Sequence, residues 1–188
     1  MASLGEAERT LLRGIGVMIF VTVGTQGPFD RLVRTVDRWA ADKKRTDVFA
    51  QIGPSKAQFE HIQAEKFIDP AEFRKRAESA SLIIAHAGMG SIITALELGK
   101  RIIVMPRQAS KGEQRNDHQL ATAKRLAEQG SIDVAFDETE LMDKLNHLNS
   151  IDKAKRLSAQ ASPDLVSAIR TFIETGRLDI ERLPPPAL

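Results

Sequence analysis

Two glycine-containing segments of the chain are the ones best suited to hold a charged ligand. The first runs from Gly24 to Gly27, and the second is His86-Ala-Gly-Met-Gly-Ser91. Glycine lets a backbone approach a ligand closely, and free N–H groups at the start of a helix attract phosphate oxygens. Both segments are therefore candidate diphosphate-binding sites. A plain tight turn explains the first equally well, and packing at a strand end explains His86 equally well.

A third segment, residues 105–119, is rich in charged and amide side chains. It contains three cations, two carboxylates and the run Asn116-Asp-His-Gln119. Asp and Gln side chains suit sugar hydroxyls because they form short, directional hydrogen bonds with them. We predict sugar contacts from this segment, with a solvated loop as the alternative.

The elements that would position these segments alternate along the chain between strand and helix. Apolar, β-branched runs predict strands at 17–23, 46–52, 65–68, 81–85, 101–105 and 132–135. Helical spacing and capping residues predict helices beginning at Pro28 and at 70–80, 91–98, 117–129, 137–148 and 164–174. This alternation predicts an α/β fold, a Rossmann-like parallel sheet with helices on both faces. Ligands of such sheets bind beyond the carboxyl ends of the strands, where all three segments would lie.

Several other site classes are disfavoured by the same residues. The Gly24–Gly27 segment lacks the G-x-G-x-x-G spacing of dinucleotide-binding domains, and it is not a G-x-x-x-x-G-K-[ST] phosphate loop. Gln51 ends the second strand, where an NAD-binding domain favours an acidic residue. No second histidine stands at metal-ligand spacing from His86. We therefore predict neither a metal nor a cofactor.

Composition and length fit a single globular domain. The chain has 188 residues, of which 42% are hydrophobic and 28% charged, and it has no cysteine, which permits a cytoplasmic location. A net charge of +2 with interleaved signs argues against nucleic-acid binding. We expect a flexible extension at 1–17, a nucleotide-sugar-binding domain at 18–149, and a C-terminal helix with a Pro-rich tail at 150–188 that docks on a partner.

Taken together, the three segments resemble the glycosyltransferase family 28 C-terminal domain. The likeness rests on Phe20-Val-Thr-Val-Gly-Thr-Gln26 with Phe29-Asp30, on Ala85-His-Ala-Gly-Met-Gly-Ser91 and on Asn116-Asp-His-Gln119, and it covers about 18–148. The chain is most similar to the stand-alone form of this domain. That form occurs as the small subunit of the eukaryotic dolichol-linked GlcNAc transferase and as PssE-type subunits of bacterial exopolysaccharide synthesis, and residues 105–119 look most like the bacterial branch.

The resemblance implies the C-terminal, donor-binding half of a GT-B enzyme divided between two polypeptides. The reaction would be an inverting transfer of a sugar from a UDP-sugar to a lipid-linked acceptor. A membrane-associated partner subunit would carry the acceptor site and the general base, so no catalytic residue is assigned to this chain. The chain itself would be cytoplasmic and peripheral at the inner face of the membrane through that partner.

The resemblance also implies roles for individual residues. The diphosphate would be held by Gly24, Thr25, Gln26, His86, Gly88, Met89, Gly90 and Ser91. The donor sugar would be held by Arg107, Arg115, Asn116, Asp117, His118 and Gln119. Family members often bind the ribose with a glutamate eight residues after the motif histidine. Here that position is Thr94 and the nearest acid is Glu97. A hydroxyl bonds a ribose less strongly than a carboxylate does.

Three interpretations of specificity and function stay open. The cations Arg107, Lys111 and Arg115 suggest an acidic donor such as UDP-glucuronate. A non-catalytic, regulatory module that binds nucleotide sugars is the main alternative to the enzyme. An independent α/β enzyme such as a sugar-phosphate epimerase is a more distant one.

Overall fold

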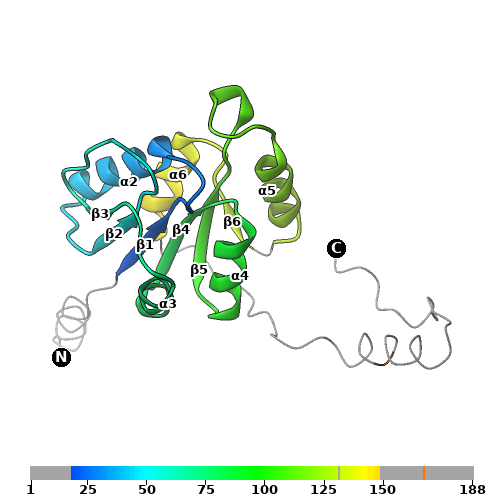
Figure 1. Cartoon of the computed structure of the whole chain (residues 1–188), viewed down its shortest axis with the longest axis horizontal. Coiled ribbons are helices and arrows are strands. Elements are labelled where there is room, and N and C mark those ends of the chain that lie inside the picture. Colours follow the sequence, from blue (N-terminus) through cyan, green and yellow to red (C-terminus); the bar gives the residue numbers. More distant parts are fainter. Residues whose placement is uncertain (1–17, 131, 149–166, 168–188) are drawn as a thin grey trace, which may run out of the picture. The chain divides into compact units, whose positions relative to one another are not determined.

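A six-stranded parallel sheet forms the centre of the domain. The computed structural model describes residues 18–130 and 132–148 and the single residue 167. The strands are β1 (Ile19–Thr22), β2 (Val48–Gln51), β3 (Gln63–Glu65), β4 (Leu82–His86), β5 (Arg101–Met105) and β6 (Asp133–Val134). They lie in the order β3-β2-β1-β4-β5-β6, and every neighbouring pair is parallel (Figure 1). The predicted extension at 1–17 and the predicted helix and tail at 150–188 lie outside the described residues, apart from residue 167.

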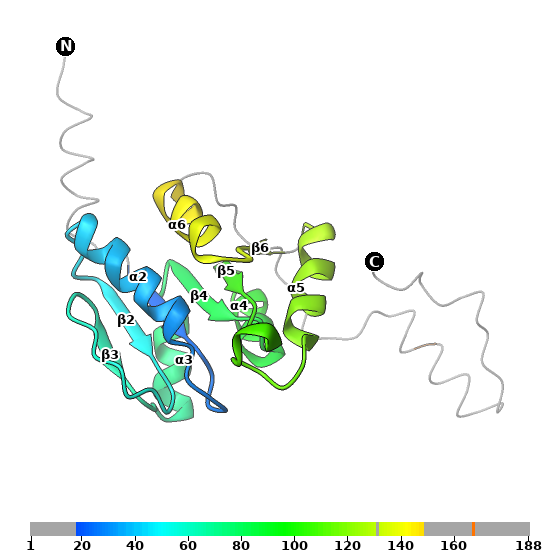
Figure 2. The ribbon, with the colours of Figure 1, turned by 90° about the horizontal axis from the view of Figure 1, so that it is seen from above.

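Helices cover both faces of this sheet. They are α2 (Asp30–Asp42), α3 (Pro70–Ser79), α4 (Met89–Glu97), α5 (His118–Glu128) and α6 (Glu138–Asn146), with the 3-10 turn η1 (Ala109–Lys111) before α5. Figure 2 shows α2 and α6 on one side of the sheet and α3 and α4 on the other. The predicted Rossmann-like fold class is thus confirmed.

Alternation along the strands explains the two layers. Successive side chains of a strand point to opposite faces of its sheet. In β1, Ile19 and Val21 belong to the buried cluster that contains the apolar stripes of α2 and α6. Phe20, between them, belongs to the cluster that contains buried residues of α3, α4 and α5. Both faces of each central strand are therefore buried, as its continuous apolar run predicts.

Most local signals in the sequence mark real element ends. The Asp69 carboxylate caps α3 by accepting hydrogen bonds from two N–H groups of its first turn, both at 2.9 Å. Gly99 follows the end of α4 with a φ of 61°, a left-handed conformation that suits glycine.

Several element bounds differ from the prediction by one or two residues; helix α2, for example, begins at Asp30, with Phe29 as its N-cap, rather than at Pro28. Two of the differences have a clear local cause. Helix α4 begins at Met89 rather than at residue 91, because Gly88 adopts the extended conformation of an N-cap. The edge strand β3 spans 63–65 rather than 65–68. The apolar residue that suggested the later position, Ile68, packs on the second core cluster after the strand has ended.

The strand order reverses between β1 and β4. From β1 the sheet continues through β2 to β3 on one side, and from β4 it continues through β5 to β6 on the other side. Open α/β sheets bind ligands at such a switch point. The segment after β1 is Gly24–Gly27, and the segment after β4 contains Gly88. Since β5 lies next to β4, its following segment, 106–117, reaches the same carboxyl edge of the sheet.

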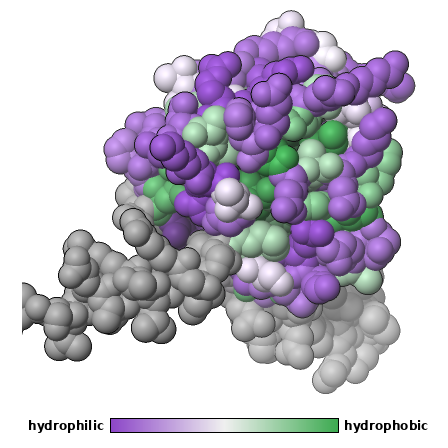
Figure 3. Space-filling view, turned by 90° about the vertical axis from the view of Figure 1, so that its left-hand side faces the viewer, coloured by the Kyte–Doolittle hydropathy of each residue, from purple (hydrophilic) through white to green (hydrophobic). Residues whose placement is uncertain are grey.

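The surface of the described domain is mixed in character. Figure 3 shows one face on which hydrophilic side chains predominate and hydrophobic ones lie between them. Among the described residues, no helix has the length and apolar character that crossing a bilayer requires. Within residues 18–130 and 132–148, three large hydrophobic side chains are exposed, namely those of Phe67, Met89 and Ile93. Met89 and Ile93 lie about one turn apart on α4, whose first residues belong to the second glycine segment.

Candidate functional site

The His86 imidazole lies between the two glycine segments. A Cβ atom added to Gly24 would come within 2.8 Å of His86 Cε1, and one added to Gly88 would come within 2.1 Å of Nε2. Gly24 also has a φ of 73°, a backbone conformation that residues other than glycine rarely adopt. The ring therefore packs directly on the backbone of both segments, and both positions require glycine.

His86 is neutral at physiological pH. Burial, and then the nearby charge of Arg107, lower its pKa from 6.5 to about 4, against a smaller opposing contribution from the Thr22 backbone. Its Nδ1 atom is buried, and no described residue meets it with normal hydrogen-bond geometry. A neutral imidazole can donate one hydrogen bond and accept one, which suits contact with a phosphate oxygen or with a backbone group.

The start of α4 presents free N–H groups beside this ring. The first hydrogen bond of the helix runs from Ile92 N to the Gly88 carbonyl at 3.3 Å. The preceding N–H groups, those of Met89, Gly90 and Ser91, have no partner within the helix, and they carry the positive end of the helix dipole. Such a helix start favours an anion.

Gln51, at the end of β2, holds the first glycine segment in place through its side-chain amide. Its side chain is buried, and Nε2 donates to the carbonyls of Gly24 and Lys66, both at 3.0 Å. The Thr22 hydroxyl donates to Gln51 Oε1 at 2.8 Å. In the sequence alone, Gln51 is visible only as a residue that argues against NAD binding. Its position at the end of a buried strand was the signal that its amide needs internal partners.

Arg107 is buried and makes its hydrogen bonds within the chain. Its side chain is 3% exposed, and the guanidinium donates to the carbonyls of Val23 (2.8 Å), Gly27 (2.7 Å), Pro28 (2.6 Å) and Glu113 (3.3 Å). Both terminal nitrogens of Arg107 serve backbone carbonyls in this geometry, so the structure gives the side chain an internal role, and its contact with the donor sugar stays a prediction.

The other predicted sugar-binding residues lie together at the start of α5. Asp117 accepts a hydrogen bond from the Ala109 N–H at 2.9 Å, and Gln119 Oε1 accepts one from the Arg107 N–H at 3.2 Å. His118 donates its N–H to Asn116 Oδ1 at 3.3 Å. These bonds shape the segment and leave Asp117 Oδ2 and Gln119 Nε2 with capacity for a ligand. Arg115, Asn116, Asp117 and His118 are exposed, and Gln119 is half-buried.

The two residues predicted to contact the ribose both lie on α4, at different distances from its first residue. The Thr94 hydroxyl donates to the Gly90 carbonyl at 2.8 Å, which leaves its oxygen free to accept. Glu97 is the last residue of α4, about 12 Å along the axis from the start of the helix. It pairs with Arg74 of α3 at 3.8 Å. Thr94 therefore lies nearer than Glu97 to the second glycine segment, at the start of α4.

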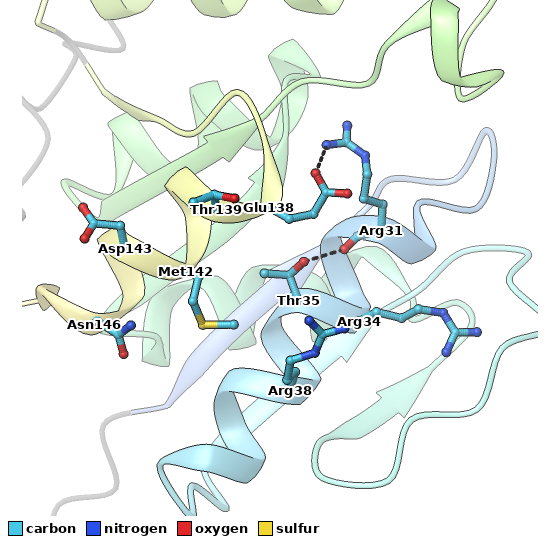
Figure 4. A pocket seen from close by; sticks show the side chains of 9 residues that line it. All are labelled: Arg31, Arg34, Thr35, Arg38, Glu138, Thr139, Met142, Asp143 and Asn146. Atoms are coloured by element: carbon cyan, nitrogen blue, oxygen red, sulfur yellow. Dashed lines mark hydrogen bonds and ion pairs between the residues drawn. The ribbon is translucent and has the colours of Figure 1, made fainter.

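A groove of about 640 Å³ lies between α2 and α6 (Figure 4). The residues that line it are Arg31, Arg34, Thr35, Arg38, Glu138, Thr139, Met142, Asp143 and Asn146, none of which sequence reasoning assigned to a site. Figure 4 shows Arg31 turned towards Glu138 of α6, to which Nη1 donates at 3.1 Å. Among the described residues no group of three or more His, Asp or Glu side chains is placed to hold a metal ion.

Comparison with known proteins identifies the family. The profile of the glycosyltransferase family 28 C-terminal domain matches residues 18–173. The human UDP-N-acetylglucosamine transferase subunit ALG13 is 32% identical over 124 residues, which is 61% of this chain and only 10% of the human protein.

Solved structures agree at the level of the fold. An NMR structure of ALG13 superposes with a TM-score of 0.55 at 20% identity, over 84% of this chain and 96% of that one. A putative UDP-N-acetylglucosamine 2-epimerase from Listeria monocytogenes superposes with a TM-score of 0.56 at 13% identity, over 87% of this chain and 48% of the epimerase. Because the profile matches most of its length, the chain belongs to the family of glycosyltransferase family 28 C-terminal domains.

Proposed function

We propose that this chain is the donor-binding catalytic subunit of a two-component inverting glycosyltransferase. The enzyme moves a sugar from a UDP-sugar to a lipid-linked acceptor in exopolysaccharide synthesis. One observation supports the division into subunits: the human relative is itself named a transferase subunit. The acceptor site and the general base belong to a membrane-associated partner, through which this chain sits at the cytoplasmic face of the membrane.

The arrangement of His86 between Gly24 and Gly88 carries this proposal. It places two close-packed glycine backbones, a neutral imidazole and the start of α4 at one switch point of the sheet. In the proposed site the segments Gly24–Gln26 and Gly88–Ser91 hold the diphosphate. As the bond to the sugar breaks, negative charge develops on the departing UDP. Preorganised N–H groups and the helix dipole would stabilise that charge.

The remaining predicted residues take the outer parts of the donor. Thr94 is proposed to accept a hydrogen bond from the ribose, and Asn116, Asp117, His118 and Gln119 to contact the sugar. The hypothesis of an acidic donor now depends on Arg115. Arg107 is engaged with carbonyls, and Lys111 lies 3.7 Å from Glu138. Competition between UDP-glucose and UDP-glucuronate tests it, and equal affinities that Arg115→Ala leaves unchanged would dismiss the acidic donor.

Reconstitution tests the proposed activity. The full chain is expressed with and without the membrane protein encoded beside its gene, and sugar transfer from UDP-sugars to lipid is measured. We expect transfer only when both chains are present. We also expect Gly88→Ala, whose added Cβ would lie 2.1 Å from His86 Nε2, to abolish most of it, while Glu78→Gln, in an exposed ion pair on α3, serves as the control outside the proposed site. Binding without turnover in any pairing would support the regulatory module instead, and turnover by this chain alone would support an independent enzyme.

A further inference from the structure

The geometry points to a clamp made of Arg107, Arg31 and Glu113 that positions the two loops of the donor site relative to each other. In this inference, which rests on the proposed function, Arg107 is a positioning residue. It sets the affinity for every nucleotide ligand without touching any of them. The two loops are the segment after β1, residues 23–29, and the segment after β5, residues 106–117.

Arg107 fastens the second loop to the first. Its Nη2 donates to the carbonyls of Val23 and Gly27, and its Nη1 donates to the carbonyl of Pro28. These acceptors lie at both ends of the first glycine segment, so a single guanidinium fixes the whole turn. The fit is close, because a Cβ added to Gly27 would already lie 3.4 Å from Nη1.

Arg31 forms the second connection, which runs from α2, just after the first loop, to the second loop. From the first turn of α2 it binds the Glu113 carboxylate through two parallel bonds, at 2.7 Å and 2.9 Å, and donates to the Pro106 carbonyl at 3.2 Å. Glu113 also accepts from the Gln108 N–H at 3.0 Å. The Arg31 and Glu113 side chains are only 11% and 13% exposed, so solvent screens the pair weakly.

The aromatic ring of Phe29 links the two connections. The guanidinium carbon of Arg107 lies 4.9 Å from the ring centroid, and that of Arg31 lies 5.3 Å from it. The Glu113 backbone carbonyl completes the network by accepting from Arg107 Nη1 at 3.3 Å. Before any ligand binds, Arg107 thus holds the segment after β1, and Arg31 holds the segment after β5. Such preorganisation favours binding, because the ligand then needs to order less of the protein.

Lysine cannot replace Arg107 in this role. The guanidinium serves four carbonyls with two nitrogens in a planar fork, whereas a lysine ammonium is a single nitrogen on a flexible stem. Arg107→Lys therefore keeps the charge and loses the clamp. This separates positioning from general attraction between the positive charge and the ligand, which a lysine would largely preserve.

Calorimetric titration of the full chain with UDP, UDP-glucose and UDP-glucuronate tests the clamp. We expect Arg107→Lys to weaken all three ligands by the same factor, at least about tenfold, which is about 1.4 kcal/mol. Glu113→Gln, which removes the charge that holds Arg31, should weaken all three by about three- to tenfold. Should Arg107→Lys fail to fold, Glu113→Gln still carries the test. Val48→Ala is the control for stability alone, since it shortens a buried side chain at the amino end of β2, away from both loops.

Three results would overturn the clamp while leaving the proposed function intact. The first is wild-type affinity in both loop variants. The second is a loss confined to UDP-glucuronate, which would show a direct contact between a cation and the sugar acid. The third is an equal loss in Val48→Ala, which would show an effect of stability alone. If instead the wild-type chain binds none of the three ligands at millimolar concentration, the proposed function itself fails.

Discussion

Replacing Gly88 with alanine tests the contact between the His86 ring and the second glycine segment. The new Cβ atom would lie 2.1 Å from Nε2, 2.8 Å from Cε1 and 2.9 Å from Cδ2 of the ring. All three distances are shorter than Cβ atoms show in real structures. Gly88 has a φ of −87°, which alanine adopts freely, so the whole penalty comes from the clash.

The clash should destabilise the domain measurably. Overpacking of a filled site costs about 1–3 kcal/mol, and we expect a loss in this range for Gly88→Ala. The His86 ring must also turn away from Gly88 and leave its present position between the two segments, so we expect UDP to bind at least about tenfold more weakly. Gly90→Ala is the matched control for stability alone, because its Cβ meets nothing within 4 Å and alanine is favoured over glycine inside a helix. That variant should be neutral or slightly more stable.

A double-mutant cycle makes the assignment to His86 specific. In the His86→Ala background the ring is gone, so adding Gly88→Ala should cost less than in the wild type. We expect a coupling of about 1 kcal/mol or more. Urea unfolding gives the stabilities and calorimetric titration gives the UDP affinities. The reasoning is refuted if Gly88→Ala costs no more than Gly90→Ala, or if its cost is the same with and without the His86 ring.

Three further predictions follow from burial and charge. The folded-state pKa of His86, about 4, lies below the ordinary 6.5, so between these values the unfolded chain binds the proton more readily. Stability is therefore fully present above pH 6.5 and falls by up to about 3 kcal/mol towards pH 4, and urea unfolding of His86→Gln should show a flatter profile. Glu113→Gln should destabilise the domain by about 1–3 kcal/mol in the same assay, because its ion pair is largely buried, whereas Glu78→Gln, in an exposed pair, should change it by less than about 0.5 kcal/mol. Gln51→Glu should cost about 2–4 kcal/mol because a carboxylate cannot donate to the two carbonyls that the amide serves, and a titration with NAD should still show no binding.

Sequence periodicity was sufficient to predict the fold and the place of the glycine segments. Buried parallel strands carry continuous apolar runs, and capping residues such as Asp69 mark the helix starts by local chemistry. Once the sheet is parallel, the segments that follow strands must meet at its carboxyl edge. The edge strand β3 was misplaced because its three residues are exposed and carry no apolar pattern.

The internal connections of the site could not be predicted in this way. Arg31 and Glu113 are 82 residues apart in the chain, so nothing local signals their pairing. Arg107 has the same appearance in the sequence as a solvated or ligand-binding cation. Only the folded chain shows that its partners are backbone carbonyls of another loop. A charge in a polar loop therefore indicates the neighbourhood of the site but not the side chain's role within it.

The central claim is that the two glycine segments around His86 bind the nucleotide diphosphate of the donor. Titrating the ¹⁵N-labelled full chain with UDP while following its amide resonances tests this most directly. We predict saturable shifts concentrated in residues 24–27 and 86–91, with smaller ones in 106–119. The absence of shifts at millimolar UDP, or shifts confined to the groove between α2 and α6, would contradict the claim.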